Sequence, residues 1–132
     1  MAGDEDEVRR DDTTEALLTA DLRLAEFLKG DPPLPHALLL VVSGDQRGEI
    51  LTMDNSPAIV GRVADADVMI DDTTVSRRHA ILRHGPDGLE VEDLGSSNGT
   101  TMNGNPMTGS FHLIDGDLVG FGSATVLVKR IA

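Results

Sequence analysis

Three short polar segments lie between residues 61 and 104 of the chain: Gly-Arg at 61–62, Ser-Arg-Arg-His at 76–79 and Gly-Ser-Ser-Asn-Gly-Thr at 95–100. Runs of β-type residues separate the segments, which places each of them in a loop between strands. The segments carry Arg, Ser and Asn, and an Arg side chain can donate two hydrogen bonds at once to an oxyanion. Loops of this kind suit the binding of a phosphate group from several sides.

Short β-type runs also make up the rest of the chain beyond residue 36. We expect strands at residues 37–42, 49–53, 58–60, 68–70, 80–83, 89–94, 117–121 and 124–129. The sequence Gly-Pro-Asp-Gly at 85–88 is a strong reverse-turn signal, and residues 89–94 alternate as a half-buried strand does. Many short strands at near-regular spacing predict an all-β sandwich or barrel.

The ordered set of Gly-Arg, Ser-Arg-Arg-His and Ser-Ser-Asn-Gly-Thr resembles a forkhead-associated (FHA) domain, a phosphothreonine-binding module. The resemblance covers roughly residues 37–132, and the motifs are specific as a set although none is specific alone. It implies a β-sandwich of two packed, largely antiparallel sheets, with the binding loops clustered at one end.

The resemblance also assigns roles to single residues of the three loops. Arg62 and Ser76 match the main phosphate contacts of the family, Arg77 matches a second donor, and Ser97 matches a supporting hydroxyl. Asn98 matches the residue whose side-chain amide holds the main chain of the bound peptide. The family's preference for phosphothreonine over phosphoserine is attributed to a small pocket for the γ-methyl group.

Four further residues are expected to support the site without touching the phosphate. His79 matches a residue that braces the loops of the family, and Gly61, Gly99 and Thr100 complete the motifs around it. Asn98 followed by Gly99 is also a natural tight-turn sequence, and this structural role can coexist with ligand contact.

Residues 1–36 lack the short β-type runs of the rest of the chain. They form an acidic tail with four basic and ten acidic side chains, a net charge of −6. Residues 1–12 predict disorder because they carry dense charge and few apolar groups. Asp12 and Glu15 resemble a helix cap, and Leu17, Leu24 and Leu28 recur at helical spacing, which predicts a short helix over 15–29. A Pro-rich linker follows, so the expected division is a tail at 1–36 and an FHA domain at 37–132.

Thr13 and Thr14 form an exposed pair in acidic surroundings and are candidate phosphorylation sites. The tail loosely resembles those of small actinobacterial FHA regulators of 2-oxoglutarate metabolism. In that family a kinase phosphorylates a Thr-Thr pair, and the tail then folds onto its own FHA domain. The residues that follow the pair here, Glu15 to Leu17, depart from the family's pattern. The alternative is that the two threonines are only a helix cap and a solvated residue.

Composition narrows the remaining classes of function. The chain has 132 residues, a net charge of −12, three Phe and no Trp, Tyr or Cys. This charge argues against nucleic acid as a partner, and no base-stacking surface is available. No apolar run is long enough for a membrane span, and the acidic N-terminus is unlike a signal peptide, so we expect a cytoplasmic protein.

Catalytic and metal-binding interpretations find little support in the sequence. Ser76 and His79 with Asp71 and Asp72 superficially resemble a hydrolytic triad, but the strained turn that would expose a nucleophilic serine has no counterpart. The histidines lack further ligands at metal-binding spacing, and no cofactor is implied. We therefore expect no enzyme activity and no metal.

The sequence favours a phosphothreonine-peptide-binding signalling adaptor that acts with Ser/Thr protein kinases. Its partners would be phosphothreonine-containing proteins, the kinase, and its own phosphorylated tail. One alternative is a metabolic regulator that binds enzymes independently of phosphate and is switched off by tail phosphorylation. Another is a constitutive scaffold whose tail helix docks through Leu17, Leu24 and Leu28.

Overall fold

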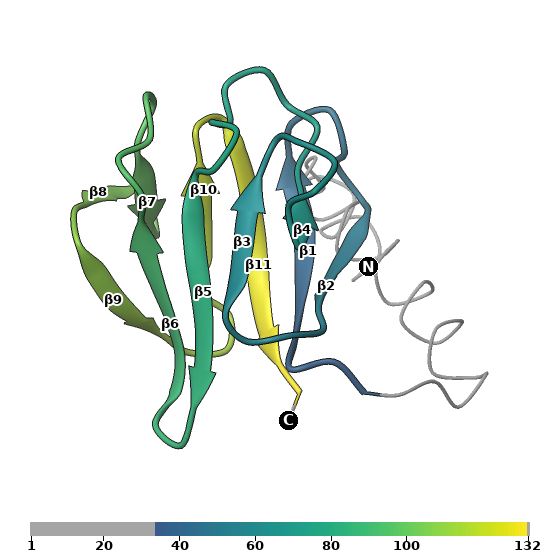
Figure 1. The fold of residues 1–132 in the computed structure, drawn as a ribbon, viewed down its shortest axis with the longest axis vertical. Coiled ribbons are helices and arrows are strands. Elements are labelled where there is room, and N and C mark those ends of the chain that lie inside the picture. Colours follow the sequence, from purple (N-terminus) through teal and green to yellow (C-terminus); the bar gives the residue numbers. More distant parts are fainter. Residues whose placement is uncertain (1–33, 132) are drawn as a thin grey trace, which may run out of the picture.

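The computed structural model describes residues 34–131, and the whole of this region is built from β-strands and the turns between them (Figure 1). The strands are β1 (Ala37–Ser43), β2 (Ile50–Met53), β3 (Ala58–Gly61), β4 (Val68–Met69), β5 (Ala80–Gly85), β6 (Gly88–Asp93), β7 (Thr100–Met102), β8 (Asn105–Met107), β9 (Ser110–Leu113), β10 (Leu118–Phe121) and β11 (Ala124–Arg130). The expected helix at 15–29, the disorder of residues 1–12 and the threonine pair lie outside the described residues.

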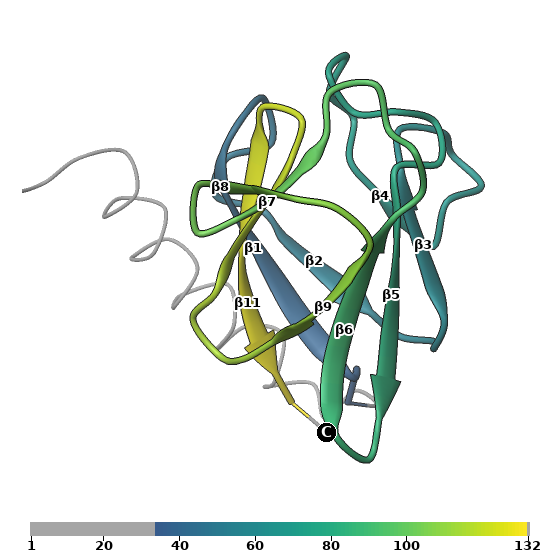
Figure 2. The ribbon, with the colours of Figure 1, turned by 90° about the vertical axis from the view of Figure 1, so that its left-hand side faces the viewer.

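The strands form two sheets that pack face to face, as Figure 2 shows. One sheet has the order β2-β1-β11-β10-β7-β8, and the other has the order β4-β3-β5-β6-β9. The registered strand pairs are antiparallel except β3 with β4, which run parallel. The prediction of a two-sheet, largely antiparallel sandwich is confirmed.

Strands β7, β8 and β9 were not predicted from the sequence. Their sequences are Thr-Thr-Met, Asn-Pro-Met and Ser-Phe-His-Leu, and β8 and β9 lie at the outer edges of their sheets. β8 is largely exposed and contains Pro106, which an edge strand tolerates, and β7 and β9 have only three and four residues. The signal on which strand prediction depends is therefore weak in this region.

The core lies between the sheets and is filled by residues that alternate along the strands. In β1, Leu39 and Val41 point inward and are 1% and 0% exposed. The intervening side chains point to the outer face of the sheet. There, Leu40 and Val42 form a second apolar cluster, separate from the core, with Ile50, Leu118 and Leu127.

The loops after β3, before β5 and after β6 gather at one end of the sandwich, at the top of Figure 1. The chain enters at the opposite end, where the backbone N–H of Ile131 donates to the carbonyl of His36 at 2.9 Å. Within the loop after β3, the Asp67 carboxylate accepts a hydrogen bond from the backbone N–H of Ile59 at 2.8 Å.

No helix with the length and apolar character of a membrane span occurs among residues 34–131.

Candidate phosphopeptide-binding loops

Gly61 and Arg62 begin the first loop, and their backbone is packed against the second. A Cβ atom on Gly61 would fall well inside van der Waals contact with the carbonyl oxygen of Arg77, so only glycine fits there. The backbone N–H of Arg62 donates to the Ser76 carbonyl at 3.1 Å, and its Nε–H donates to the Val75 carbonyl at 3.0 Å. These bonds orient the exposed guanidinium and leave its terminal Nη groups for a ligand.

Ser76 connects the second loop to the third. Its Oγ accepts a hydrogen bond from the backbone N–H of Ser97 at 3.0 Å. This bond occupies a lone pair, so the hydroxyl hydrogen of the half-buried Ser76 can still be donated to an oxyanion. The contact also brings Ser97, which is exposed, beside the Ser76 hydroxyl.

His79 lies beneath the loops and is fully buried, with an exposed fraction of 0%. Its Nδ1 accepts a hydrogen bond from the backbone N–H of Ser76 at 3.1 Å, so the ring proton must be on Nε2. Nε2 lies 2.9 Å from the Gly99 carbonyl and donates to it. The neutral ring thus joins the second loop to the third, and its edge packs against Phe121 of the core.

The electrostatics of this position favour the neutral imidazole. Burial lowers the pKa of His79 below its ordinary value of 6.5. The hydrogen bond to the Gly99 carbonyl and the Asp93 carboxylate, 4.0 Å from Nε2, raise the pKa in part but do not reverse the effect. His79 therefore keeps one tautomer and supports the site without adding charge to it.

Asp93, which the sequence analysis missed, organises the third loop. Its carboxylate accepts hydrogen bonds from the backbone N–H groups of Gly95 and Ser96 at 2.8 and 3.1 Å. It also accepts from the hydroxyls of Ser96 and Thr100 at 2.6 and 2.7 Å. Burial raises the pKa of Asp93, but these bonds outweigh that effect and hold the pKa below its ordinary value.

A sequence signal for Asp93 existed. An Asp followed within two residues by Gly, and then by Ser, is typical of a side chain that caps its own turn. The alternation of residues 89–94 obscured the signal, because Asp93 was interpreted only as part of a half-buried strand.

Asn98 links the third loop to the second in another place. Its Nδ2 donates to the Thr74 carbonyl at 2.8 Å, which leaves its Oδ1 and a second amide hydrogen for a peptide. The hydroxyl of Thr74 lies 2.8 Å from that of Ser123 and accepts from the Ser123 N–H at 2.9 Å. The loops of one sheet are thereby tied to the turn between β10 and β11 of the other.

The structure therefore places the predicted residues of the loops close to one another. Arg62, Ser76, Ser97 and Asn98 surround one end of the sandwich, with His79 and Thr100 buried below them. Arg77 is exposed in the second loop, and its carbonyl oxygen contacts Gly61. Gly99 has a φ of 85°, a conformation that favours glycine, and its carbonyl accepts a hydrogen bond from Nε2–H of His79.

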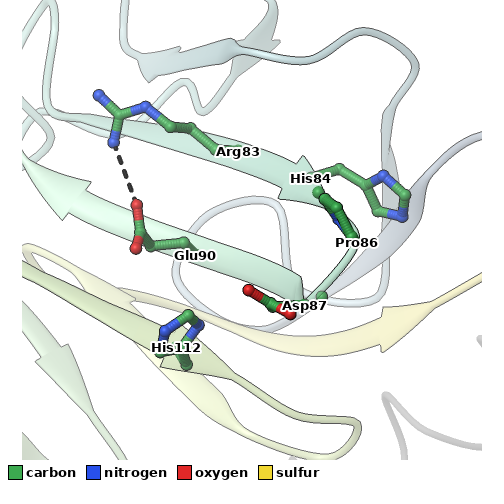
Figure 3. Close-up of a pocket in the computed structure, with 8 residues that line it drawn as sticks. Arg83, His84, Pro86, Asp87, Glu90 and His112 are labelled. Carbon is green, nitrogen blue, oxygen red and sulfur yellow. Dashed lines mark hydrogen bonds and ion pairs between the residues drawn. The ribbon is translucent and has the colours of Figure 1, made fainter.

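A shallow pocket of about 280 Å³ lies at the other end of the molecule, around the β5–β6 turn (Figure 3). Arg83, Asp87, Glu90 and His112 contribute to its lining, and Arg83 pairs with Glu90 at 3.4 Å. Across residues 34–131, no group of three or more His, Asp or Glu side chains is arranged to hold a metal ion.

The fold and the loops together define a β-sandwich that presents anion donors at one end. The sequence profile described as FHA domain matches residues 58–122. A solved structure described as a structural and functional analysis of phosphothreonine-dependent FHA domain interactions is 32% identical, with a TM-score of 0.64, and the match covers 73% of this chain and 97% of that one. The chain belongs to the FHA domain family.

Further relatives narrow the group. The match to an oxoglutarate dehydrogenase inhibitor of Corynebacterium jeikeium is 42% identical and covers 68% of this chain and 62% of that protein. The match to the glycogen accumulation regulator GarA of Mycobacterium tuberculosis is 40% identical and covers 72% and 57%. The chain thus spans less than two thirds of the length of these relatives. A crystal structure of the FhaA FHA domain, complexed with the intracellular domain of a partner, is 33% identical with a TM-score of 0.62 and coverage of 70% and 99%.

Proposed function

We propose that this chain is a cytoplasmic, non-catalytic regulatory protein that binds phosphothreonine peptides through the loops around Arg62, Ser76 and Asn98. The observation that carries the proposal is the Ser97 N–H to Ser76 Oγ hydrogen bond of 3.0 Å. It joins the second and third loops at the point where the Arg62 backbone meets the Ser76 carbonyl. Donors from three loops are thus fixed around one position before any ligand arrives.

The chemistry of these donors suits a phosphate dianion. The Arg62 guanidinium can offer both Nη groups, and Ser76 can offer its hydroxyl hydrogen. Arg77 adds a second positive charge from the same end of the sandwich. Because the backbone already holds the side chains, little of the binding free energy is lost in ordering them.

A peptide needs a second point of contact to be held in one register. Asn98 offers an amide oxygen and one remaining amide hydrogen, which match the N–H and C=O groups of an extended main chain. The bond from Asn98 to the Thr74 carbonyl fixes the direction in which the amide points. We therefore assign Arg62, Ser76, Arg77 and Ser97 to phosphate, and Asn98 to the peptide backbone.

Substitution of Arg62 tests the proposal directly. We expect Arg62→Ala to weaken binding of a phosphothreonine peptide by roughly 10- to 100-fold, because a charge-assisted hydrogen bond contributes about 1.5–3 kcal/mol. Ser76→Ala should weaken the same complex. Isothermal titration calorimetry measures both effects, with the unphosphorylated peptide and a phosphoserine peptide as ligand controls.

Arg78→Ala is the matched control, since Arg78 is an exposed Arg of the second loop that is not assigned to the phosphate. The Arg78→Ala variant should bind the peptide within about twofold of the unsubstituted protein, because Arg78 donates no hydrogen bond to the phosphate in the proposed site and an exposed charge without a direct contact contributes little. Unchanged affinity in a folded Arg62→Ala variant would contradict the proposal.

The relatives' names favour a second role for the same loops, the control of a metabolic enzyme. In this alternative the unphosphorylated protein binds an enzyme such as an oxoglutarate dehydrogenase, and a Ser/Thr kinase switches it off by phosphorylating Thr13 or Thr14. From Thr14 to Ala37 is 23 positions, which span about 75 Å when extended and average about 26 Å when flexible. A domain of this size has a radius of gyration of about 12 Å, so the tail can reach the loops.

Phosphorylation of the full chain on the Thr13–Thr14 pair tests the switch. We expect the backbone NMR signals of Arg62 and Ser76 to shift at high dilution, because a tethered ligand acts at an effective concentration near the millimolar range. Inhibition of an oxoglutarate dehydrogenase by the protein should be lost in parallel. Thr13→Ala combined with Thr14→Ala is the control, and unchanged signals in the phosphorylated chain would rule out self-recognition.

A further inference from the structure

A patch of apolar side chains lies on the outer face of the sheet that contains β1, away from the core. It comprises the apolar cluster described above together with one residue that points to the same face of β1, and we call it the outer patch: Leu40, Val42, Ile50, Leu118 and Leu127, with Leu38. Leu40 is paired with Leu127 on one side and Ile50 on the other, so the patch is continuous across the strands. It belongs neither to the core nor to the phosphopeptide-binding loops.

The composition of β1 shows that the patch is more than a chance grouping of single apolar residues. A strand with one face in water alternates apolar and polar side chains, whereas residues 37–42 are apolar throughout. Leu38, Leu40 and Val42 are 5%, 7% and 5% exposed, although the second sheet packs against the other face of β1. A strand of this composition is typical of a sheet that is covered on both sides.

We infer that residues 15–29 of the same chain dock on the outer patch as an amphipathic helix. Thirty-three residues precede the described region, and the chain enters beside the start of β1, at the edge of the patch. Leu17, Leu24 and Leu28 share one face of a helix at this spacing, while Thr19 and Glu26 lie on the opposite face. A segment tethered this closely has an advantage over a partner that must arrive from solution.

The dimensions of the two elements agree. From Leu17 to Leu28 is 11 positions, or about 16 Å along a helix, and from Leu38 to Val42 is four positions, or about 13 Å along a strand. The Gly-Asp-Pro-Pro sequence at 30–33 can reverse the chain between them. The helix then runs antiparallel to β1, with Leu28 near Leu38 and Leu17 near Val42.

This orientation has a consequence for the threonine pair. β1 runs from the end where the chain enters to the end that carries the phosphopeptide-binding loops. Thr13 and Thr14, one turn before Leu17, would therefore sit at the loop end, in the extended segment that precedes the helix. The docking itself does not depend on the proposed function, since it requires only apolar contact.

Cross-linking in the full chain tests the docking, and the absence of native Cys makes the engineered thiols unique. We expect a short bis-maleimide to link Leu17→Cys with Val42→Cys at least about tenfold faster than Leu17→Cys with Leu38→Cys. A freely moving tail predicts the reverse order, because the loop to residue 38 is shorter. Glu26→Cys with Leu40→Cys is the control for the opposite helix face and should react as slowly as the second pair.

A second experiment, methyl NMR, places every substitution in the tail and leaves the residues of the sandwich unchanged. Leu24→Asp should shift the methyl NMR signals of Leu118 and Leu127, whereas Thr19→Asp, which adds the same charge on the opposite face, should leave them in place. Equal cross-linking rates for all three thiol pairs, or methyl signals that do not shift in Leu24→Asp, would overturn the proposal. Cross-linked dimers whose yield rises with protein concentration would overturn it in favour of a second copy on the patch. Loss of docking with intact phosphopeptide binding would leave the proposed function standing.

Discussion

The imidazole of His79 is neutral and carries its proton on Nε2, and this single state holds two loops together. Protonation would place a hydrogen on Nδ1, where the Ser76 N–H already donates, and would break that contact. Burial disfavours the charged imidazolium, and this desolvation is the reason that the pKa of His79 lies below 6.5. His79 therefore supports the loops by hydrogen bonding, and its neutral ring adds no positive charge beside the proposed phosphate position.

This depressed pKa predicts how stability depends on pH. Below pH 6.5 the unfolded chain binds a proton at residue 79 that the folded chain does not, so stability present above pH 6.5 is lost as pH falls toward the folded-state pKa. Urea unfolding from pH 7.5 to pH 5.5 should show a smaller loss for His79→Asn, which has no titrating ring, than for the unsubstituted protein. His112→Gln, at an exposed position, should retain the original pH dependence. Identical slopes for the unsubstituted protein and His79→Asn would contradict the assignment.

The β6–β7 loop owes its shape to one carboxylate at the end of β6. Asp93 satisfies two backbone N–H groups and two hydroxyls, so the segment 95–99 has a defined form with little apolar burial of its own. The loop in turn supplies Ser97 and Asn98 to the site. These proposed binding residues are exposed, and the Asp93 carboxylate beneath them holds the loop in place.

Asp93→Asn should loosen this loop while the sandwich remains folded. The two backbone N–H groups share one carboxylate oxygen and the two hydroxyls share the other, so an amide, with one acceptor oxygen, leaves one of these pairs without its acceptor at a cost of about 1–3 kcal/mol. We expect faster hydrogen exchange at Gly95 and Ser96 and weaker phosphopeptide affinity. Glu92→Gln, which alters the neighbouring surface pair with Arg83, is the control and should change neither. Exchange rates that stay the same in Asp93→Asn would show that the loop is held by other contacts.

The sequence predicted two features of the molecule: the strands whose apolar side chains alternate, and the loops whose motifs occur in a recognisable order. The strands that cross the core were found because residues such as Val126 and Val128 must alternate inward. Strands β7, β8 and β9 were missed because each has only three or four residues, too few to show a clear apolar alternation. The three loops were found from their Arg, Ser and Asn residues, and the structure places those residues together.

Contacts between residues that are far apart in the chain could not be predicted from the sequence. Nothing in the residue order indicates that Thr74 meets Ser123, 49 positions later, or that the Ser76 hydroxyl receives the Ser97 N–H. The outer patch was also hidden, because the apolar run at 37–42 predicts a buried strand without saying which neighbour covers each face. Such contacts depend on the register between strands that are distant in the chain, and the pattern of residues within one strand does not determine that register.

The hydrogen bond from Ile59 to the Asp67 carboxylate has a consequence for how this protein behaves at high concentration. β4 registers only with Val60 and Gly61, so the outward N–H of Ile59 would otherwise be an open donor on the flank of β3. An open flank invites strand addition by another chain and, from there, aggregation. The Asp67 side chain occupies that donor and adds negative charge, so the loop that presents Arg62 also makes this part of β3 a poorer template for a strand of another chain.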